Sequence, residues 1–347
     1  MQVCHHNPTD ELIQCANMQE KDVVQLLIMF VTFCLDTLRQ KPPTIPGILS
    51  GLRYSFRSRF IAESAFDNIL LVSLKAGVSR LPYTPRTRLP YTFDMVQYII
   101  SKNTQVGFLL KDFVKAVAVA MAYYLCLRSS EYVSKTAVPA HGAHQFESQS
   151  VEFQVGGRLL SSHLMHRYKW HHITLVKFTL QHAKNIKGGF GVPIWFTTEG
   201  VDPDAVAFLQ LVFLWAQLSN RGPDDPFLSY RDESNRLHCL TYKVFQVTIK
   251  DCAVAFGFDP AWFNTHSVRM AAPTVLRAAG GSDREVLFLG RWKGVPTSLT
   301  YQGSSTANNN RMLELLTNST LFTSSDITLG RVLPPTKGTK KSTVRRF

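Results

Sequence analysis

The sequence lacks an apolar stretch long enough to span a membrane. Its two most apolar segments, 23–35 and 116–127, have 13 and 12 residues, whereas a spanning helix needs about 20. We therefore interpret both as buried helices and expect no membrane partner. No Lys or Arg precedes Lys21, and Asp10 and Glu11 stand where the apolar region of a signal peptide belongs. We expect no signal peptide for this reason.

The sequence also has no CxxC pair. Its six cysteines are scattered, and several lie in apolar, helical surroundings, which excludes a disulfide scaffold and favours reduced thiols in an intracellular protein. Histidine is concentrated locally, because six of the eleven lie between 141 and 172. Two HxxH pairs there are compatible with zinc, but no cysteine lies nearby. We predict a polar surface loop, no metal and no cofactor.

Acidic residues are scarce relative to basic ones. There are 25 Asp and Glu against 38 Lys and Arg, so the net charge is +13 and the isoelectric point about 9.5. This balance favours an anionic partner, nucleic acid first and an anionic membrane surface second. Apolar residues are plentiful at 45% of the chain, which excludes a wholly disordered or collagen-like protein. The length of 347 residues indicates two or three domains.

Two basic, proline-containing segments divide the chain. Residues 77–90 hold three prolines, three arginines and no acid, which indicates an extended linker at a domain boundary. The last 17 residues, 331–347, hold six basic residues and no acid, which is typical of a disordered tail. We therefore predict a loosely ordered N-terminus (1–19), a small helical domain (20–88) and a larger domain (92–330).

Hydrophobic periodicity and capping signals predict a mainly α-helical protein with a small antiparallel sheet. Strands are expected over 171–181 and 190–196, joined by the turn KNIKGG as a β-hairpin. We expect Pro273 in the first turn of a helix that begins near Ala271, because proline is tolerated there and not in a helix interior. The expected helices are 22–38, 44–60, 66–74, two within 92–127, 202–220, 241–256 and 282–289.

Arginines gather on one predicted helix and in the linker that follows. Because guanidinium groups bind phosphates irrespective of base sequence, these side chains are candidate contacts to the DNA backbone. They are Arg53, Arg57, Arg59, Arg86 and Arg88.

Five short motifs follow one another in the larger domain: LRSSE, HAKNIKGG, THSVR, FLGRW and SLTYQ. Arg269 of the third motif stands 23 positions before Trp292, and Trp292 stands nine positions before Tyr301. This order and spacing resemble the tyrosine recombinases of the phage-integrase type. The resemblance covers 92–330, and the N-terminal helices resemble the family's core-binding domain more loosely. Its candidate catalytic residues are Arg128, Lys184, His266, Arg269, Trp292 and Tyr301.

The resemblance implies an enzyme that cuts and rejoins double-stranded DNA without metal or ATP. Tyr301 would attack the scissile phosphate and form a 3′-phosphotyrosine, while Arg128 and Arg269 would hold the non-bridging oxygens. His266 would accept the tyrosine proton, and Lys184 would protonate the leaving 5′ oxygen.

Two positions of this pattern leave alternatives. Lys187 shares the hairpin turn with Lys184 and is the other candidate for the catalytic lysine. Trp292 stands where many members carry histidine; its indole N–H can donate a hydrogen bond to phosphate but cannot shuttle a proton.

The family further implies a homo-tetramer on DNA, with a C-terminal helix that packs into a neighbouring subunit. Residues 311–316, RMLELL, are the best candidate for that helix. The GRW motif and the spacing of 56 positions from Arg128 to Lys184 resemble recombinases of eukaryotic mobile elements, the crypton and DIRS-like groups. That subtype implies a nuclear location, whereas a prokaryotic source implies the cytoplasm or nucleoid.

Three alternative functions are compatible with the sequence. A type IB topoisomerase shares the constellation but relaxes plasmids without strand exchange. A domesticated DNA-binding protein would bind without cutting, although intact Arg128, His266, Arg269 and Tyr301 argue against it. A basic helical scaffold that binds no DNA would cause no mobility shift of any duplex.

Overall fold

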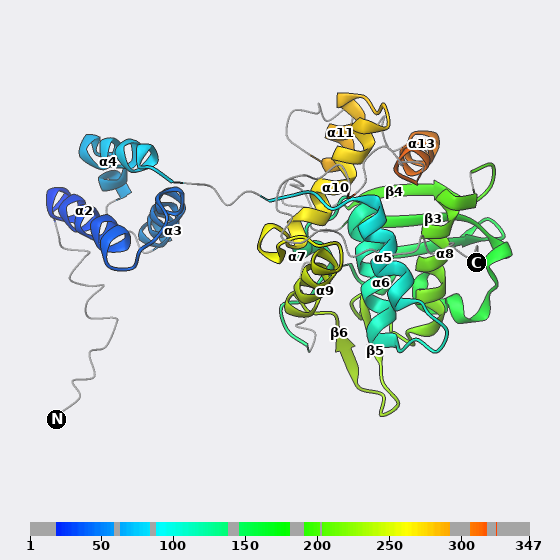
Figure 1. Cartoon of the computed structure of the whole chain (residues 1–347). Coiled ribbons are helices and arrows are strands. Elements are labelled where there is room, and N and C mark those ends of the chain that lie inside the picture. Colours follow the sequence, from blue (N-terminus) through cyan, green and yellow to red (C-terminus); the bar gives the residue numbers. More distant parts are fainter. Residues whose placement is uncertain are drawn as a thin grey trace. The chain divides into compact units, whose positions relative to one another are not determined.

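The computed structural model describes residues 19–58, 63–83, 88–137, 146–180, 191–201, 203–291, 306–317 and 324 (Figure 1). The chain separates into two compact units, residues 1–86 and 87–347. Each unit has its own hydrophobic core.

Three α-helices form the described part of the first unit: α2 (Glu20–Asp36), α3 (Ile45–Ser58) and α4 (Ile69–Arg80). Two 3₁₀ turns, η1 (Pro42–Thr44) and η2 (Glu63–Asp67), connect them. The prediction that 77–90 is extended is wrong for residues 77–80, which complete α4. Val78 is buried in the core of this unit, and its burial favours the last helical turn.

The second unit contains a four-stranded antiparallel sheet in the order β2-β1-β3-β4. Its hairpin of β3 and β4 confirms the predicted pair of strands: Val176 lies opposite Phe196. In β3 the residues that alternate toward the core, Val176, Phe178 and Leu180, are buried. The turn, 181–190, lies outside the described residues. The strand bounds are β1 (Val151–Val155), β2 (Arg158–Ser161), β3 (Ile173–Leu180) and β4 (Val192–Thr197), with a separate pair, β5 (Ser229–Arg231) and β6 (Leu237–Cys239).

Helix α6 (Leu110–Tyr124) is the centre of this unit. All of its residues from Phe113 to Tyr124 except Lys115 are buried, and it packs against α5, α8 and α10 (Figure 1). A helix that is apolar on all sides belongs in a core, and no helix in the described residues is long and apolar enough to cross a membrane. The other helices are α5 (Phe93–Asn103), α7 (Ser129–Tyr132), α8 (Pro203–Leu218), α9 (Tyr242–Ala255), α10 (Thr265–Ala278), α11 (Asp283–Gly290) and α13 (Thr306–Thr317). The predicted class, mainly α with a small antiparallel sheet, is confirmed.

The histidine-rich segment is not a surface loop where it is described. It forms β1, β2, η4 (Ser162–Arg167) and η5 (Trp170–His172). Met165 is fully buried, and Gln217 of α8 donates to the Tyr168 carbonyl at 2.7 Å, so packing against α8 orders the segment. His141 and His144 lie outside the described residues, among which no cluster of three potential metal ligands occurs. The described cysteines, Cys34, Cys126, Cys239 and Cys252, are free and buried.

Pro273 lies inside α10, so the prediction that this helix begins near Ala271 is wrong. The helix begins at Thr265, after the Asn264 side chain that accepts hydrogen bonds from the first-turn amides. Because proline has no N–H, the Arg269 carbonyl four residues earlier loses its helical donor. The buried Cys126 thiol donates to that carbonyl at 3.4 Å, which explains how the proline is tolerated.

Helix α13 packs on its own unit. Met312, Leu313 and Leu316 are buried in the same core as α6, and the helix contacts β4, α8 and α10. Asn310 also accepts a hydrogen bond from the Thr197 amide of β4 at 3.2 Å. Within the single chain of this structure, the sheet edge and helices cover the apolar face of α13, and the packing of 311–316 into a neighbouring subunit stays a prediction.

Candidate active site

A pocket of about 290 Å³ opens beside the first turn of α10. It brings together Arg128, His266 and Arg269 from two segments that lie more than a hundred residues apart in sequence. Its other lining residues are Leu127, Ser129, Ser130 and Thr265. The remaining predicted catalytic residues, Lys184, Trp292 and Tyr301, lie outside the described residues, as do Arg59 and Arg86.

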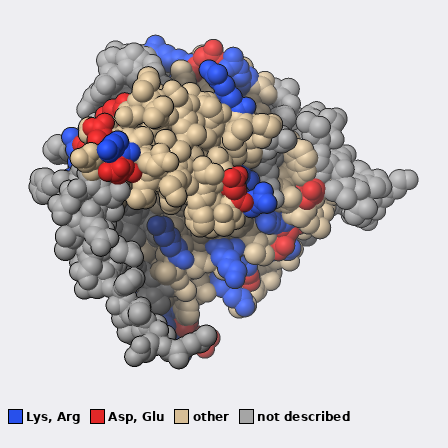
Figure 2. Space-filling view, turned by 90° about the vertical axis from the view of Figure 1, so that its left-hand side faces the viewer, with Lys and Arg blue, Asp and Glu red and all other residues tan. Residues whose placement is uncertain are grey.

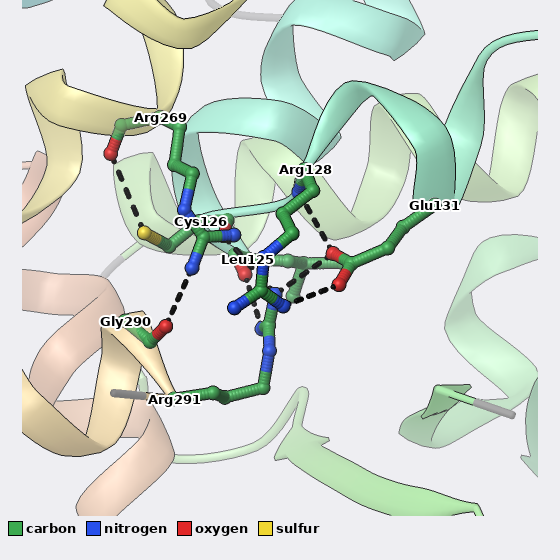
Figure 3. Close-up of polar contacts among 7 residues, drawn as sticks. All are labelled: Leu125, Cys126, Arg128, Glu131, Arg269, Gly290 and Arg291. Atoms are coloured by element: carbon green, nitrogen blue, oxygen red, sulfur yellow. Dashed lines mark hydrogen bonds and ion pairs between the residues drawn. The ribbon is translucent and has the colours of Figure 1, made fainter. Parts of the chain in front are cut away.

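Arg128 is held in place by Glu131, which is only 5% exposed. One carboxylate oxygen accepts from the Arg128 Nη1 at 3.0 Å, and the other accepts from the Arg128 amide at 2.7 Å (Figure 3). Among the described residues Glu131 is the only acceptor of the Arg128 side chain, so Nε and Nη2 remain to bind a ligand. A quarter of this side chain is exposed.

Arg269 is a buried donor on α10. Its Nη1 donates to the Cys126 carbonyl at 2.8 Å and its Nη2 to the Gly290 carbonyl at 2.6 Å (Figure 3). Burial lowers the pKa of Arg269, and the positive charges of Arg291 and Arg128 act in the same direction. An arginine nevertheless remains protonated in water. No carboxylate in the described part of the chain forms an ion pair with Arg269, so its charge is left for an anionic ligand.

Arg291, which the sequence analysis did not identify, is a third arginine at the site. Its Nη2 donates to Glu131 Oε2 at 3.0 Å and to the Cys126 carbonyl at 3.1 Å. One signal for it exists in the sequence. Arg291 directly follows Gly290, at the end of a helix with a capped start, where a residue in the left-handed conformation commonly ends a helix. Arg291 also directly precedes Trp292.

The charges at the site are unbalanced. In the part of the chain that the structure describes, three guanidinium groups, those of Arg128, Arg269 and Arg291, lie around one carboxylate, that of Glu131. The local charge of +2 is unfavourable without a bound anion, because like charges in a partly buried site repel one another strongly. The arrangement therefore fits a doubly charged anion.

His266 is affected by the same charges. Partial burial lowers its pKa first, and the positive charges of Arg269, Arg88 and Arg128 lower it further. A histidine with a lowered pKa is neutral near pH 7 and can accept a proton. Arg88 was predicted from the sequence as a phosphate contact. The structure places its exposed side chain close enough to influence His266.

A lysine on the hairpin is tied down by its neighbours. Lys177 of β3 forms an ion pair of 2.6 Å with Glu152 and lies over the Trp195 ring at 5.1 Å. These contacts fix Lys177 on the sheet. The candidates for a catalytic lysine are therefore those of the turn, Lys184 and Lys187.

Arg53 and Arg57 of α3 differ in how many of their guanidinium donors are free to bind a phosphate. Arg53 donates from Nε to Glu63 at 2.9 Å and from both Nη atoms to Asp67 at 2.8 and 2.7 Å. Arg57 has one long contact of 3.5 Å with Glu63, and three-quarters of its side chain is exposed. Arg57 therefore has most of its donors available to a phosphate, whereas Arg53 connects α3 to η2.

Comparison with known proteins adds little. No family model matches the chain, and no curated protein matches it. Among solved structures, the chain is similar to the integrase from mycobacterium phage Brujita, at 14% sequence identity and a TM-score of 0.36, over 84% of this chain and 77% of that one.

Proposed function

We propose that this protein is a DNA strand transferase of the tyrosine-recombinase type, which cuts and rejoins duplex DNA through a 3′-phosphotyrosine. The observation that carries the proposal is the pocket in which Arg128, Arg269 and His266 converge. Guanidinium groups are always charged and present planar donors that match phosphate oxygens. The net charge of +13 fits a polyanionic partner, double-stranded DNA.

The chemistry follows from where charge develops. When a hydroxyl attacks a phosphodiester, the pentacoordinate species carries about two negative charges, and fixed cationic donors stabilise it more than the ground state. Arg269, held by two backbone carbonyls, and Arg128, held by Glu131, are such donors. They need little reorganisation when the charge appears, because their positions are already set.

The remaining roles come from the order of the sequence motifs. Tyr301 supplies the attacking oxygen and forms a bond to phosphorus as the 5′ oxygen of the next nucleotide leaves. His266 accepts the tyrosine proton, Lys184 gives a proton to the leaving oxygen, and Trp292 donates a hydrogen bond to the phosphate. The phosphotyrosine conserves the energy of the broken bond, so rejoining needs neither ATP nor a metal.

A suicide substrate tests this function. A nicked duplex loses a short fragment after cleavage, so the covalent protein–DNA adduct accumulates and appears on a denaturing gel. We expect an adduct and, with an intact partner duplex, strand exchange by a tetramer. Plasmid relaxation without strand exchange would indicate a type IB topoisomerase. Duplex binding with no adduct would indicate a DNA-binding protein that does not cut.

The pH dependence of cleavage tests the role of His266. Since the pKa of His266 is lowered, the acidic limb of kcat/KM, which reports the free enzyme, is expected below pH of about 6.5, the ordinary histidine value. The rate falls as pH drops through this limb, because the base becomes protonated. Arg88→Gln removes one of the charges that lower the pKa, so the limb is expected to move toward higher pH. The same limb in His266→Gln would exclude His266 as the titrating group.

Salt dependence tests which arginines of α3 contact DNA. On the face shown in Figure 2, Lys and Arg side chains lie beside Asp and Glu around a broad uncharged area, so exposed basic residues are not all equally available. Arg57→Ala is expected to reduce the slope of log affinity against log salt by about 0.9, one phosphate contact. Arg53→Ala serves as the matched comparison and is expected to change the slope less, because Glu63 and Asp67 already neutralise Arg53. An unchanged slope in Arg57→Ala would mean that Arg57 only faces solvent.

A further inference from the structure

The end of α11 contacts Arg269 directly and Arg128 through Glu131. Arg269 donates to the Gly290 carbonyl at 2.6 Å. The next residue, Arg291, donates from Nη1 to the Leu125 carbonyl at 2.9 Å and from Nη2 to Glu131 at 3.0 Å, the same carboxylate that holds Arg128 (Figure 3). Only 13% of the Arg291 side chain is exposed. The junction of Gly290 and Arg291 is thereby held from two directions.

The backbone of Arg291 is strained. It ends α11 in the left-handed region, with φ of 52° and ψ of 42°. Glycine is the usual residue there because it has no Cβ to clash with the following carbonyl. A larger residue persists in such a conformation only where its surroundings hold it. Here the Leu125 and Cys126 carbonyls and the Glu131 carboxylate accept hydrogen bonds from the guanidinium group and hold the residue in place. These contacts explain why an arginine stands at this position.

Arg291 acts on the phosphate site indirectly, through Glu131. It does not line the pocket, but Glu131 connects it to Arg128, with one carboxylate oxygen on each guanidinium. The chain continues from Arg291 directly into Trp292, and Tyr301 follows ten residues later. Arg291, which directly precedes Trp292 in the sequence, is thus joined through Glu131 to Arg128, a proposed phosphate ligand.

We propose that Arg291 is a positioning residue, which fixes Arg128 through Glu131 and holds the end of α11 against the Leu125 and Cys126 carbonyls, so that Arg128 and Arg269 keep their places around the phosphate. The proposal rests on the proposed function. Its physical basis is that attack requires the reacting atoms at near-contact distance, and small misplacements reduce the rate steeply. The contacts of Arg291 to Leu125, Cys126 and Glu131 are present in the structure without DNA.

The test compares Arg291→Gly, Arg291→Lys and the control Arg277→Ala. Glycine relieves the backbone strain, so the fold is expected to persist while the guanidinium is lost. We expect single-turnover adduct formation at saturating protein to fall by about 10²-fold, while duplex affinity stays near the wild-type value. Tm is expected to fall modestly, because the loss of a donor to Leu125, Cys126 and Glu131 is partly offset by the relief of backbone strain. Arg291→Lys keeps a charge beside Glu131 and is expected to recover part of the rate. Arg277, exposed near the end of α10, is expected to have no effect.

Hydrogen exchange without DNA gives a second readout. Amides of 125–131 and 283–291 are expected to exchange faster in Arg291→Gly than in wild type, because the connection between them is removed. A wild-type adduct rate in Arg291→Gly, or unchanged exchange in both segments, overturns the proposal. A rate loss matched by equal losses of affinity and Tm overturns it as well, since that pattern marks a structural role. Failure of the proposed function differs from all of these, because the wild-type protein would then form no adduct.

Discussion

Replacing Tyr301 with phenylalanine is expected to abolish the covalent protein–DNA adduct. The substitution removes one oxygen atom, the proposed nucleophile, and leaves the aromatic ring. Folding and duplex affinity are therefore expected to be retained, because phosphate binding depends on Arg128 and Arg269. The measurement is a denaturing gel after incubation with a nicked duplex, with binding followed in parallel by a mobility shift.

Two tyrosines elsewhere in the unit provide the control for this experiment. Tyr230 and Tyr242 are partly accessible and are the alternative nucleophiles. Tyr230→Phe and Tyr242→Phe are expected to form the adduct at the wild-type rate. An adduct that persists in Tyr301→Phe would remove Tyr301 from the mechanism and, with it, the inference from the nine-residue spacing.

Arg128→Ala is expected to reduce the cleavage rate by about 10²–10³-fold, the usual effect of removing one preorganised donor from a developing charge. The fold is expected to survive, because Glu131 keeps its ion pair with Arg291 and its bond to the residue 128 amide. Single-turnover kinetics with saturating protein separate this loss from any change in binding.

Arg269→Ala is expected to have at least as large an effect on the rate and an additional effect on stability. The Cys126 and Gly290 carbonyls both lose a charged donor, and buried acceptors without partners destabilise a protein. Tm is therefore expected to fall in Arg269→Ala and to stay near wild type in Arg128→Ala. The control is Arg277→Ala, on the same helix but exposed. Wild-type cleavage by Arg128→Ala would show that this pocket does not hold the scissile phosphate.

Local patterns were sufficient to predict several elements. The expected helices 241–256 and 282–289 begin at capping residues: Thr241 accepts from the Val244 amide, and Ser282 with Glu285 forms a capping box at the start of α11. Alternating apolar residues identified β3 and β4. These signals succeed because the interactions involved link residues close in sequence, or depend only on which face of an element is apolar.

The failures have the opposite character. Pro273 is accommodated inside α10 because a thiol 143 residues away donates to the carbonyl that it leaves without a helical partner. The last turn of α4 persists because Val78 fits the core of the first unit. Neither of these partners can be identified from sequence neighbours.

For the site, the sequence by itself determined the residue types and their order: an arginine before a capped turn, an HxxR pair, and a surplus of positive charge. Which charges are available was decided only by the tertiary structure. Arg53 looked like a free phosphate contact but is neutralised by Glu63 and Asp67, whereas Arg128 keeps donors beside a pocket. Arg291 was not predicted as a site residue, and its ion pair with Glu131 places it there. The physical reason is that hydrogen bonds and ion pairs act over a few ångströms and in fixed directions. Their partners are therefore set by how distant segments pack.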